Sequence, residues 1–286
     1  MRRITKIILG VLIIILIFLW VTIAKSPTTD SLNIYFLNVG QGDAELIQKG
    51  DYQILIDGGP DDSILSEIGK IMPITDRRID IVILTHPHAD HLTGINQIIQ
   101  RYEVGQIYSS GSITTSDQYL NFLNAVTSKN IPMSIPEIGD KISVFGDAEL
   151  QFLWPGKKYL GISGDNLNNT SEFVRFCEFS HCADFLGDME TDEQAIAYAQ
   201  LKANNVDYSA DLLKISHHGS TNGTNATTLN EINPQVAVIE VGVENKYGHP
   251  HAATLDLLNS RNIQDYRTDR DGTIGFSLTP GGISPN

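Results

Sequence analysis

A buried strand that runs into a cluster of metal-binding side chains is encoded by residues 79–91, IDIVILTHPHADH. The first seven residues are mostly aliphatic and β-branched, which is typical of a strand covered on both faces. The next six contain three histidines and one aspartate. Because side chains alternate along a strand, these groups can share one point only where the chain turns into a loop. Imidazole and carboxylate suit zinc and other divalent first-row ions, so the segment predicts a metal site at a strand end.

Three further motifs place similar chemistry at the ends of predicted elements. LGD (186–188) closes one predicted strand, and KISHHGS (214–220) follows another. The two adjacent histidines of KISHHGS point in different directions. We therefore expect one to bind metal and the other to face substrate or support the ligands, unless both only cap the loop. YGHPH (247–251) precedes a predicted helix, where His249 can hold a substrate anion together with the helix N-terminus or simply cap the helix.

The rest of the body alternates strand and helix patterns. Runs rich in β-branched and aromatic residues predict strands over 32–39, 52–57, 79–85, 141–145, 149–153, 173–179, 182–186, 211–215, 236–241 and 274–278. Helical spacing of apolar residues predicts helices over 92–102, 119–129, 192–202 and 254–260. No internal repeat or linker interrupts residues 32–280. The pattern predicts one α/β domain with two packed sheets covered by helices, followed by a tail over 281–286.

The N-terminal segment predicts export. Residues 7–24 carry no charge and would form a helix of about 27 Å, close to the hydrocarbon thickness of a bilayer. Basic residues in the tail 1–6 favour a cytoplasmic N-terminus and an extracellular body. Two interpretations remain: an uncleaved single-pass anchor, or a signal peptide whose cleavage would release a secreted protein. Residues 25–31 are expected to form a linker.

Composition excludes several classes of protein. The chain has 286 residues, of which 41% are hydrophobic and 19% charged, too apolar for disorder and too mixed for a multi-span membrane protein. The net charge is −14. Beyond residue 25 there are 16 basic and 34 acidic residues, a net charge of −18. A body with so much negative charge has no general electrostatic attraction for long duplex nucleic acid.

The two cysteines cannot form a disulfide scaffold or a four-cysteine zinc site. Cys177 and Cys182 flank a predicted hairpin turn. Outside the cytoplasm they can pair across it, and otherwise they would be buried thiols.

HPHADH, LGD and HHGS resemble the metal motifs of the metallo-β-lactamase superfamily. Other stretches are similar to one branch, the C-terminal hydrolase domain of ComEC, the bacterial DNA-uptake channel protein. They are NVGQGDA (38–44), LIDGG (55–59), residues 168–171, YGHPH (247–251) and YRTDRDG (266–272). The resemblance runs in order from about Leu32 to Leu278, nearly the whole body.

The resemblance implies a four-layer αββα sandwich with two divalent ions, zinc or manganese, in a cleft at the sheet edges. The ligands it implies are His86 and His88 on the first ion, Asp90, His91 and one of His217 and His218 on the second, and Asp188 between them. Asp57 would hydrogen-bond ligand histidines and set their tautomer. Two such ions can generate a bridging hydroxide near neutral pH. Asp90 or His218 could then move protons, and His249 could steady a phosphate or oxyanion.

Three departures from the family pattern limit the inference. Many members have a third histidine shortly before the bridging aspartate, and the only candidate here, His181, falls in the predicted hairpin turn. Asn168 is expected near the metal instead, which makes the first site richer in oxygen and manganese plausible. Asn38 stands where the branch usually carries aspartate. A single membrane anchor cannot form a channel for DNA, so the DNA-uptake function of ComEC is not inferred for this chain.

These observations favour an exported metal-dependent hydrolase that cleaves phosphodiesters. Its substrate would be single-stranded or short nucleic acid, or a phosphoester of the cell wall, and no protein partner is inferred. One alternative is a lactonase or β-lactamase type of carbonyl hydrolase, which requires an apolar pocket wall. A second is a metal-binding module without turnover, supported only by the missing third histidine.

Overall fold

The computed structural model describes residues 2–24, 31–164 and 166–286, and within the first helix the side chains of residues 4–19. This helix, α1 (Arg2–Ala24), covers the apolar segment predicted at 7–24, and its described large apolar side chains are exposed. Over the described part of the chain, no helix is both long and apolar enough to cross a membrane. Of the linker predicted at 25–31, all but the last residue lies outside the described residues.

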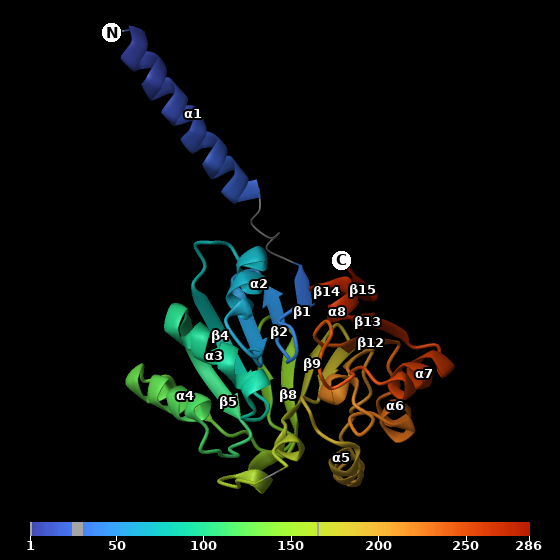
Figure 1. Ribbon diagram of the computed structural model, residues 1–286. Helices are drawn as coiled ribbons and strands as arrows, with labels where there is room; N and C mark the ends of the chain where they lie inside the picture. The colour runs from blue at the N-terminus through green and yellow to red at the C-terminus, as the bar shows by residue number, and fades with distance from the viewer. Residues whose placement is uncertain (1, 25–30, 165) are drawn as a thin grey trace.

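Two sheets form the body (Figure 1). Sheet A has the order β15-β14-β1-β2-β3-β4-β5-β6, with parallel pairing from β3 to β6 and antiparallel pairing elsewhere. Its strands are β1 (Leu32–Phe36), β2 (Glu45–Lys49), β3 (Tyr52–Ile56), β4 (Arg78–Leu84), β5 (Glu103–Ser109), β6 (Met133–Ser134), β14 (Ile274–Thr279) and β15 (Gly282–Pro285).

Sheet B has the order β13-β12-β11-β10-β9-β8-β7, parallel from β10 to β13. Its strands are β7 (Lys141–Ser143), β8 (Glu149–Trp154), β9 (Phe173–Glu178), β10 (His181–Phe185), β11 (Leu212–Lys214), β12 (Val236–Ile239) and β13 (Gln264–Arg267). The β9–β10 hairpin places Cys177 opposite Cys182, and the two form a disulfide. Of the two alternatives for these cysteines, the disulfide is therefore confirmed.

Helices cover both outer faces. The helices are α2 (Ser63–Ile71), α3 (Ala89–Arg101), α4 (Asp117–Ser128), α5 (Thr191–Ala203), α6 (Ala226–Ile232), α7 (Ala252–Ser260) and the short α8 (Thr268–Asp271). One apolar cluster lies under α2, α3 and α4, a second under α5, α6 and α7, and a third lies between the sheets. Three apolar layers between four structural layers make this the predicted αββα sandwich.

The structure adds elements that the patterns did not predict. Strand β2 has the sequence ELIQK, and its polar Glu45 and Gln48 are buried, so it lacks an apolar signature. The tail predicted over 281–286 is wrong for most of its length, since β15 forms the sheet edge and its Ile283 packs on the inter-sheet cluster. Helix α3 begins at Ala89, three residues earlier than predicted, so part of HPHADH lies in its first turn.

A close approach of two glycines holds α3 against sheet A. A Cβ on Gly94 would lie 1.8 Å from the carbonyl oxygen of Gly58, so neither position has room for a side chain. Gly58 N–H donates to the carbonyl of His91 at 2.7 Å, and Gly94 N–H donates to that of Gly59 at 3.0 Å. The start of α3 is thereby fixed beside the loop that follows β3.

Candidate metal centre

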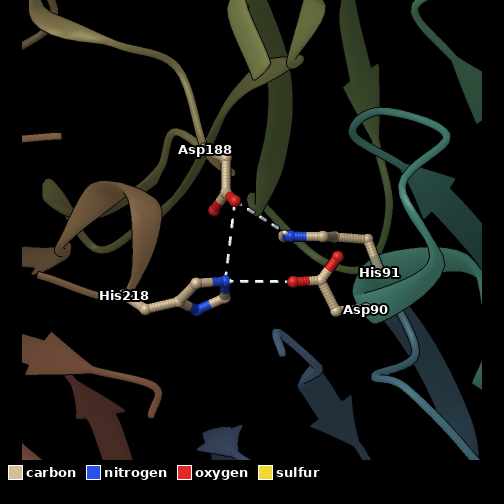
Figure 2. A group of neighbouring side chains, drawn as sticks. All are labelled: Asp90, His91, Asp188 and His218. Carbon is tan, nitrogen blue, oxygen red and sulfur yellow. Dashed lines mark ion pairs between the residues drawn. The ribbon is translucent and has the colours of Figure 1, made fainter. Parts of the chain in front are cut away.

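The ends of three strands bring the predicted motifs together (Figure 2). From β4 a short loop leads into α3, whose first turn carries Asp90 and His91. Strands β10 and β11 are parallel neighbours, so the segments that follow them begin at the same edge of sheet B. These segments carry Asp188 and His218. Residues separated by more than a hundred positions therefore converge at one point between the sheets.

Asp90, His91, Asp188 and His218 each offer one ligand atom, and these atoms all lie within 4.8 Å of one another. His91 Nε2 is 3.3 Å from Asp188 Oδ2, and His218 Nε2 is 3.5 Å from the same oxygen. His218 Nε2 is also 3.5 Å from Asp90 Oδ2. Figure 2 shows all four side chains directed inward. Three of them are buried and Asp90 is partly exposed, so solvent reaches the group from the Asp90 side.

The unpaired atoms of this group fit a divalent cation. His91 Nε2, His218 Nε2 and Asp188 Oδ1 are buried without a hydrogen-bond partner. The opposite ring nitrogens are engaged: His91 Nδ1–H donates to Asp57 Oδ2 at 2.7 Å, and His218 Nδ1–H donates to the Glu240 carbonyl at 3.0 Å. This arrangement leaves each Nε2 lone pair directed at the cluster, as in histidine metal ligands. Leaving such atoms buried without a partner is costly, and a bound cation would satisfy them.

The remaining predicted ligands form a looser half of the site. His86 Nε2 is 2.9 Å from His88 Nδ1, and the rings of His86 and His91 are 4.2 Å apart. His217 Nε2 is 3.9 Å from Asp188 Oδ2 and 3.4 Å from Asn168 Nδ2. Among the described residues, however, His86, His88 and His217 do not belong to a tightly converging group of ligand atoms. The geometry thus brings every predicted ligand to one region and gathers four of them into one candidate ion site.

The HHGS turn separates its two histidines. Both have a positive φ, 53° for His217 and 52° for His218, and their ring planes differ by 69°. His218 joins the buried group, whereas His217 lies beside Asn168 and is 21% exposed. His181, which was predicted to lie in the hairpin turn, begins β10 next to that turn and pairs with Asp211 at 3.3 Å.

A buried charged network behind the ligands was not predicted. Asp43 lies 3.1 Å from His218 Nδ1 and pairs with Lys214, and both are fully buried. Glu45 and Glu240 form a compact group with Asp43. Burial, followed by the charge of Asp43, raises the pKa of Glu240 to about 8. A signal was present in the sequence, because a lysine inside the buried strand LLKI needs an acidic partner, and NVGQGDA supplies it.

Carboxylates dominate the electrostatics of the ligand group. Burial opposes a charge on His218, but Asp188 and Asp43 outweigh it and raise the pKa of His218 to about 10. Burial also opposes ionisation of Asp188, yet His218 and His91 hold its pKa well below the usual value. The group therefore favours positive charge, which protons or a cation can supply. Competition between the two makes metal affinity rise with pH.

A cavity of about 470 Å³ opens beside this group. Its lining residues are Gln41, Pro60, Ala89, Asp90, Asn245, Lys246 and Tyr247. His249 lies between the ligand group and the cavity, with its ring centroid 5.7 Å from that of Tyr247 and 6.3 Å from that of His218. Burial, followed by the neighbouring histidines, lowers the pKa of His249 to about 4, so this imidazole is neutral at pH 7.

Comparisons with known proteins agree with the fold. Residues 37–166 match the metallo-beta-lactamase superfamily. ComE operon protein 3 of Bacillus subtilis (strain 168) is 25% identical to this chain, and Competence protein ComA of Neisseria gonorrhoeae is 22% identical. The matches cover 92% and 86% of this chain but 34% and 32% of those proteins. The chain thus spans about a third of the length of the curated relatives it matches.

Solved structures share the architecture. The metallo-beta-lactamase fold protein YhfI from Bacillus subtilis has a TM-score of 0.54 and 16% identity, covering 83% of this chain and 96% of YhfI. The metallo hydrolase Igni18 from Ignicoccus hospitalis has a TM-score of 0.56 and 12% identity, covering 86% and 100%. Fold, motifs and family match define a metal-dependent hydrolase of the metallo-β-lactamase fold. Residues 37–166 thus resemble the metallo-β-lactamase superfamily, and most of the chain is similar to the competence proteins of the ComEC family.

Proposed function

We propose that this protein is a phosphodiesterase that uses two divalent ions, zinc or manganese, to cleave single-stranded or short nucleic acid. The observation that carries the proposal is the convergence of Asp90, His91, Asp188 and His218, with three unpaired buried atoms, at the edge of a cavity lined by Lys246. A cation beside the cavity suits an anionic phosphodiester better than a neutral lactone or lactam.

The relatives support a nucleic-acid substrate. One of them is named Competence protein ComA, and another, from Haemophilus influenzae, is named Recombination protein 2. Each match covers about a third of the relative, so the proposal concerns cleavage and not transport. The acidic body argues for a small bound segment, because a long duplex would place many phosphates near a surface of net charge −18.

Each residue of the site has a defined task in this proposal. Divalent ions held there would act as Lewis acids on a phosphate oxygen and lower the pKa of water toward neutrality. Asp188 lies between His91 and His218 and would help to hold both ions. Asp90, the partly exposed member, would face the cavity as a carboxylate, because His218 and His91 outweigh burial and hold its pKa below the usual value. His249 is neutral at pH 7 and would donate a ring N–H to a phosphate oxygen.

We also propose that α1 anchors the enzyme with its catalytic body outside the cell. The apolar run at 7–24 and the basic residues before it support this orientation.

Turnover of two chromogenic substrates tests the reaction class. Full-length protein in mild detergent would be stripped of metal, reloaded with zinc or with manganese, and assayed on bis-p-nitrophenyl phosphate and on a chromogenic cephalosporin. We expect metal-dependent phosphodiester turnover that Asp188→Asn abolishes. Turnover of the cephalosporin alone would indicate that the protein is a carbonyl hydrolase instead. Tight metal binding without turnover of either substrate would favour the non-catalytic module.

A further inference from the structure

The cavity beside Asp90 has one wall whose chemistry the metal site does not explain. This wall is formed by Asn245, Lys246 and Tyr247, and both Lys246 and Tyr247 are exposed. Asp90 belongs to the same cavity, so a molecule held at this wall reaches the reacting centre. The volume of about 470 Å³ lies in the range of small-ligand sites and is large enough for one nucleotide rather than a long segment.

The wall is held in shape by the Asn245 side chain. Its Nδ2 donates to the carbonyls of Gly242 at 3.0 Å and His249 at 2.6 Å. Its Oδ1 accepts from the backbone N–H of Tyr247 at 3.2 Å and of His249 at 3.0 Å. All the donor and acceptor groups of this amide are therefore used within the loop. Asn245 is a positioning residue, and Tyr247 is presented on a preformed turn.

Tyr247 offers an aromatic platform. Its ring is nearly parallel to that of His249, with an angle of 23° between the planes, and the side chain is 53% exposed. A large aromatic ring exposed in a cavity is available to stack on a planar ligand, and every nucleobase has such a face. Lys246 Nζ lies 5.0 Å from the ring centroid, and this exposed cation can instead contact a phosphate on the same ligand.

We propose that Tyr247 and Lys246 form a nucleotide subsite that stacks one unpaired base and holds its phosphate, which makes the enzyme select single strands. The inference rests on the proposed phosphodiesterase function and adds the element that recognises the substrate. A paired base already stacks on its neighbours and cannot offer its face to Tyr247. The acidic body adds no general attraction for phosphates, so recognition depends on the base.

Variants of the two residues test the subsite. Wild type, Tyr247→Phe, Tyr247→Leu and Lys246→Met would be compared on a twelve-residue oligothymidylate, on the same length of abasic strand, and on an oligouridylate to distinguish DNA from RNA. We expect Tyr247→Leu to lower kcat/KM on base-bearing strands by about 5- to 150-fold, mainly through KM. Tyr247→Phe should retain most of the activity, and the abasic strand should not respond to Tyr247→Leu.

The chain contains a matched control. Lys158 and Tyr159 are also adjacent, with Lys158 Nζ 4.8 Å from the Tyr159 ring, but neither lines the cavity beside Asp90. Tyr159→Leu should therefore leave kcat/KM on all three substrates unchanged. Equal losses on base-bearing and abasic strands in Tyr247→Leu would overturn the subsite while leaving the phosphodiesterase proposal intact.

A binding measurement keeps the two proposals distinguishable. Anisotropy of a fluorescein-labelled oligothymidylate, with calcium replacing the loaded metal, reports the subsite without turnover. Weaker binding by Tyr247→Leu supports the subsite even if bis-p-nitrophenyl phosphate is not cleaved. Unchanged binding, or duplex bound as tightly as single strand, rejects it.

Discussion

At the scale of single residues, the site depends on groups that do not themselves face the proposed ions. Asp57 accepts the Nδ1–H of His91 at 2.7 Å and the backbone N–H of Thr85 at 2.8 Å. Its carboxylate thus fixes both the tautomer of His91 and the start of the HPHADH loop. Partners of this kind raise the basicity and restrict the orientation of a ligand imidazole.

Replacing Asp57 should weaken metal binding without unfolding the protein. In Asp57→Asn we expect metal affinity to fall about 10- to 100-fold, because His91 loses its charged partner. A calorimetric titration of the metal-stripped protein with manganese gives the dissociation constant. Asp61→Asn, an exposed carboxylate on the same loop, should match wild type. Affinity within twofold of wild type in Asp57→Asn would contradict the role assigned to Asp57.

The buried Glu240 predicts a specific pH dependence of stability. Its pKa is raised from 4.5 to about 8, so the folded state holds a proton that the unfolded state has released. Its contribution to stability is fully present below pH 4.5 and is lost as the pH rises toward 8, with a slope of at most about 1.4 kcal/mol per pH unit.

Glu240→Gln removes this titration and can keep the bond from the Ala44 N–H. Urea unfolding in EDTA at several pH values from 5 to 9 should show the stability of wild type declining relative to that of the variant. The exposed Glu244→Gln is the control. Parallel curves for wild type and Glu240→Gln would show that this carboxyl is ionised throughout.

At the scale of elements, the contact between Gly58 and Gly94 sets the position of α3. Because α3 carries Asp90 and His91 in its first turn, a shift of this helix moves two ligands at once.

Gly94→Ala should therefore damage both stability and metal binding. The new Cβ would meet the Gly58 carbonyl at 1.8 Å, and we expect a loss of at least about 1–3 kcal/mol in the free energy of unfolding. Gly69→Ala is a matched control, since Gly69 lies in α2 with open space around its Cα. Urea unfolding and metal titration of both variants measure the difference. Equal behaviour of the two variants would show that the helix shifts without cost.

At the scale of the whole molecule, the three apolar layers hold the metal centre at the junction of two sheets. Sheet A supplies Asp90 and His91 through α3, and sheet B supplies Asp188 and His218. The inter-sheet cluster includes Phe36, Phe176 and Phe185 from both sheets. Loss of packing there would separate the two halves of the site.

The proposed anchoring gives a prediction for the intact chain. After cell lysis we expect the protein to remain in the membrane fraction through an alkaline wash, because an apolar helix is not released by removing charge interactions. Protease added to intact cells without an outer barrier should digest the body. Recovery of the full-length chain from the soluble fraction would contradict the anchor, and recovery of a shortened chain from the medium would indicate cleavage.

The sequence patterns predicted one α/β domain with two packed sheets covered by helices and metal-binding motifs at strand ends, and the resemblance to the metallo-β-lactamase superfamily added the αββα order and the ligand set. Histidine-rich and aspartate-containing motifs directly after apolar strands are local patterns, and strand ends meet at sheet edges for general geometric reasons. The β9–β10 hairpin likewise made pairing of Cys177 with Cys182 a defined alternative, which the structure confirms.

Only the tertiary structure showed which of the candidate residues join the buried ligand group and which lie around it. It selected His218 over His217 for the buried group, because two residues with positive φ turn their rings apart. It also placed Asp43, Lys214 and Glu240 behind the ligands and Tyr247 in front of them. These contacts join segments about 20 to 200 residues apart, and burial and orientation across such distances depend on tertiary packing.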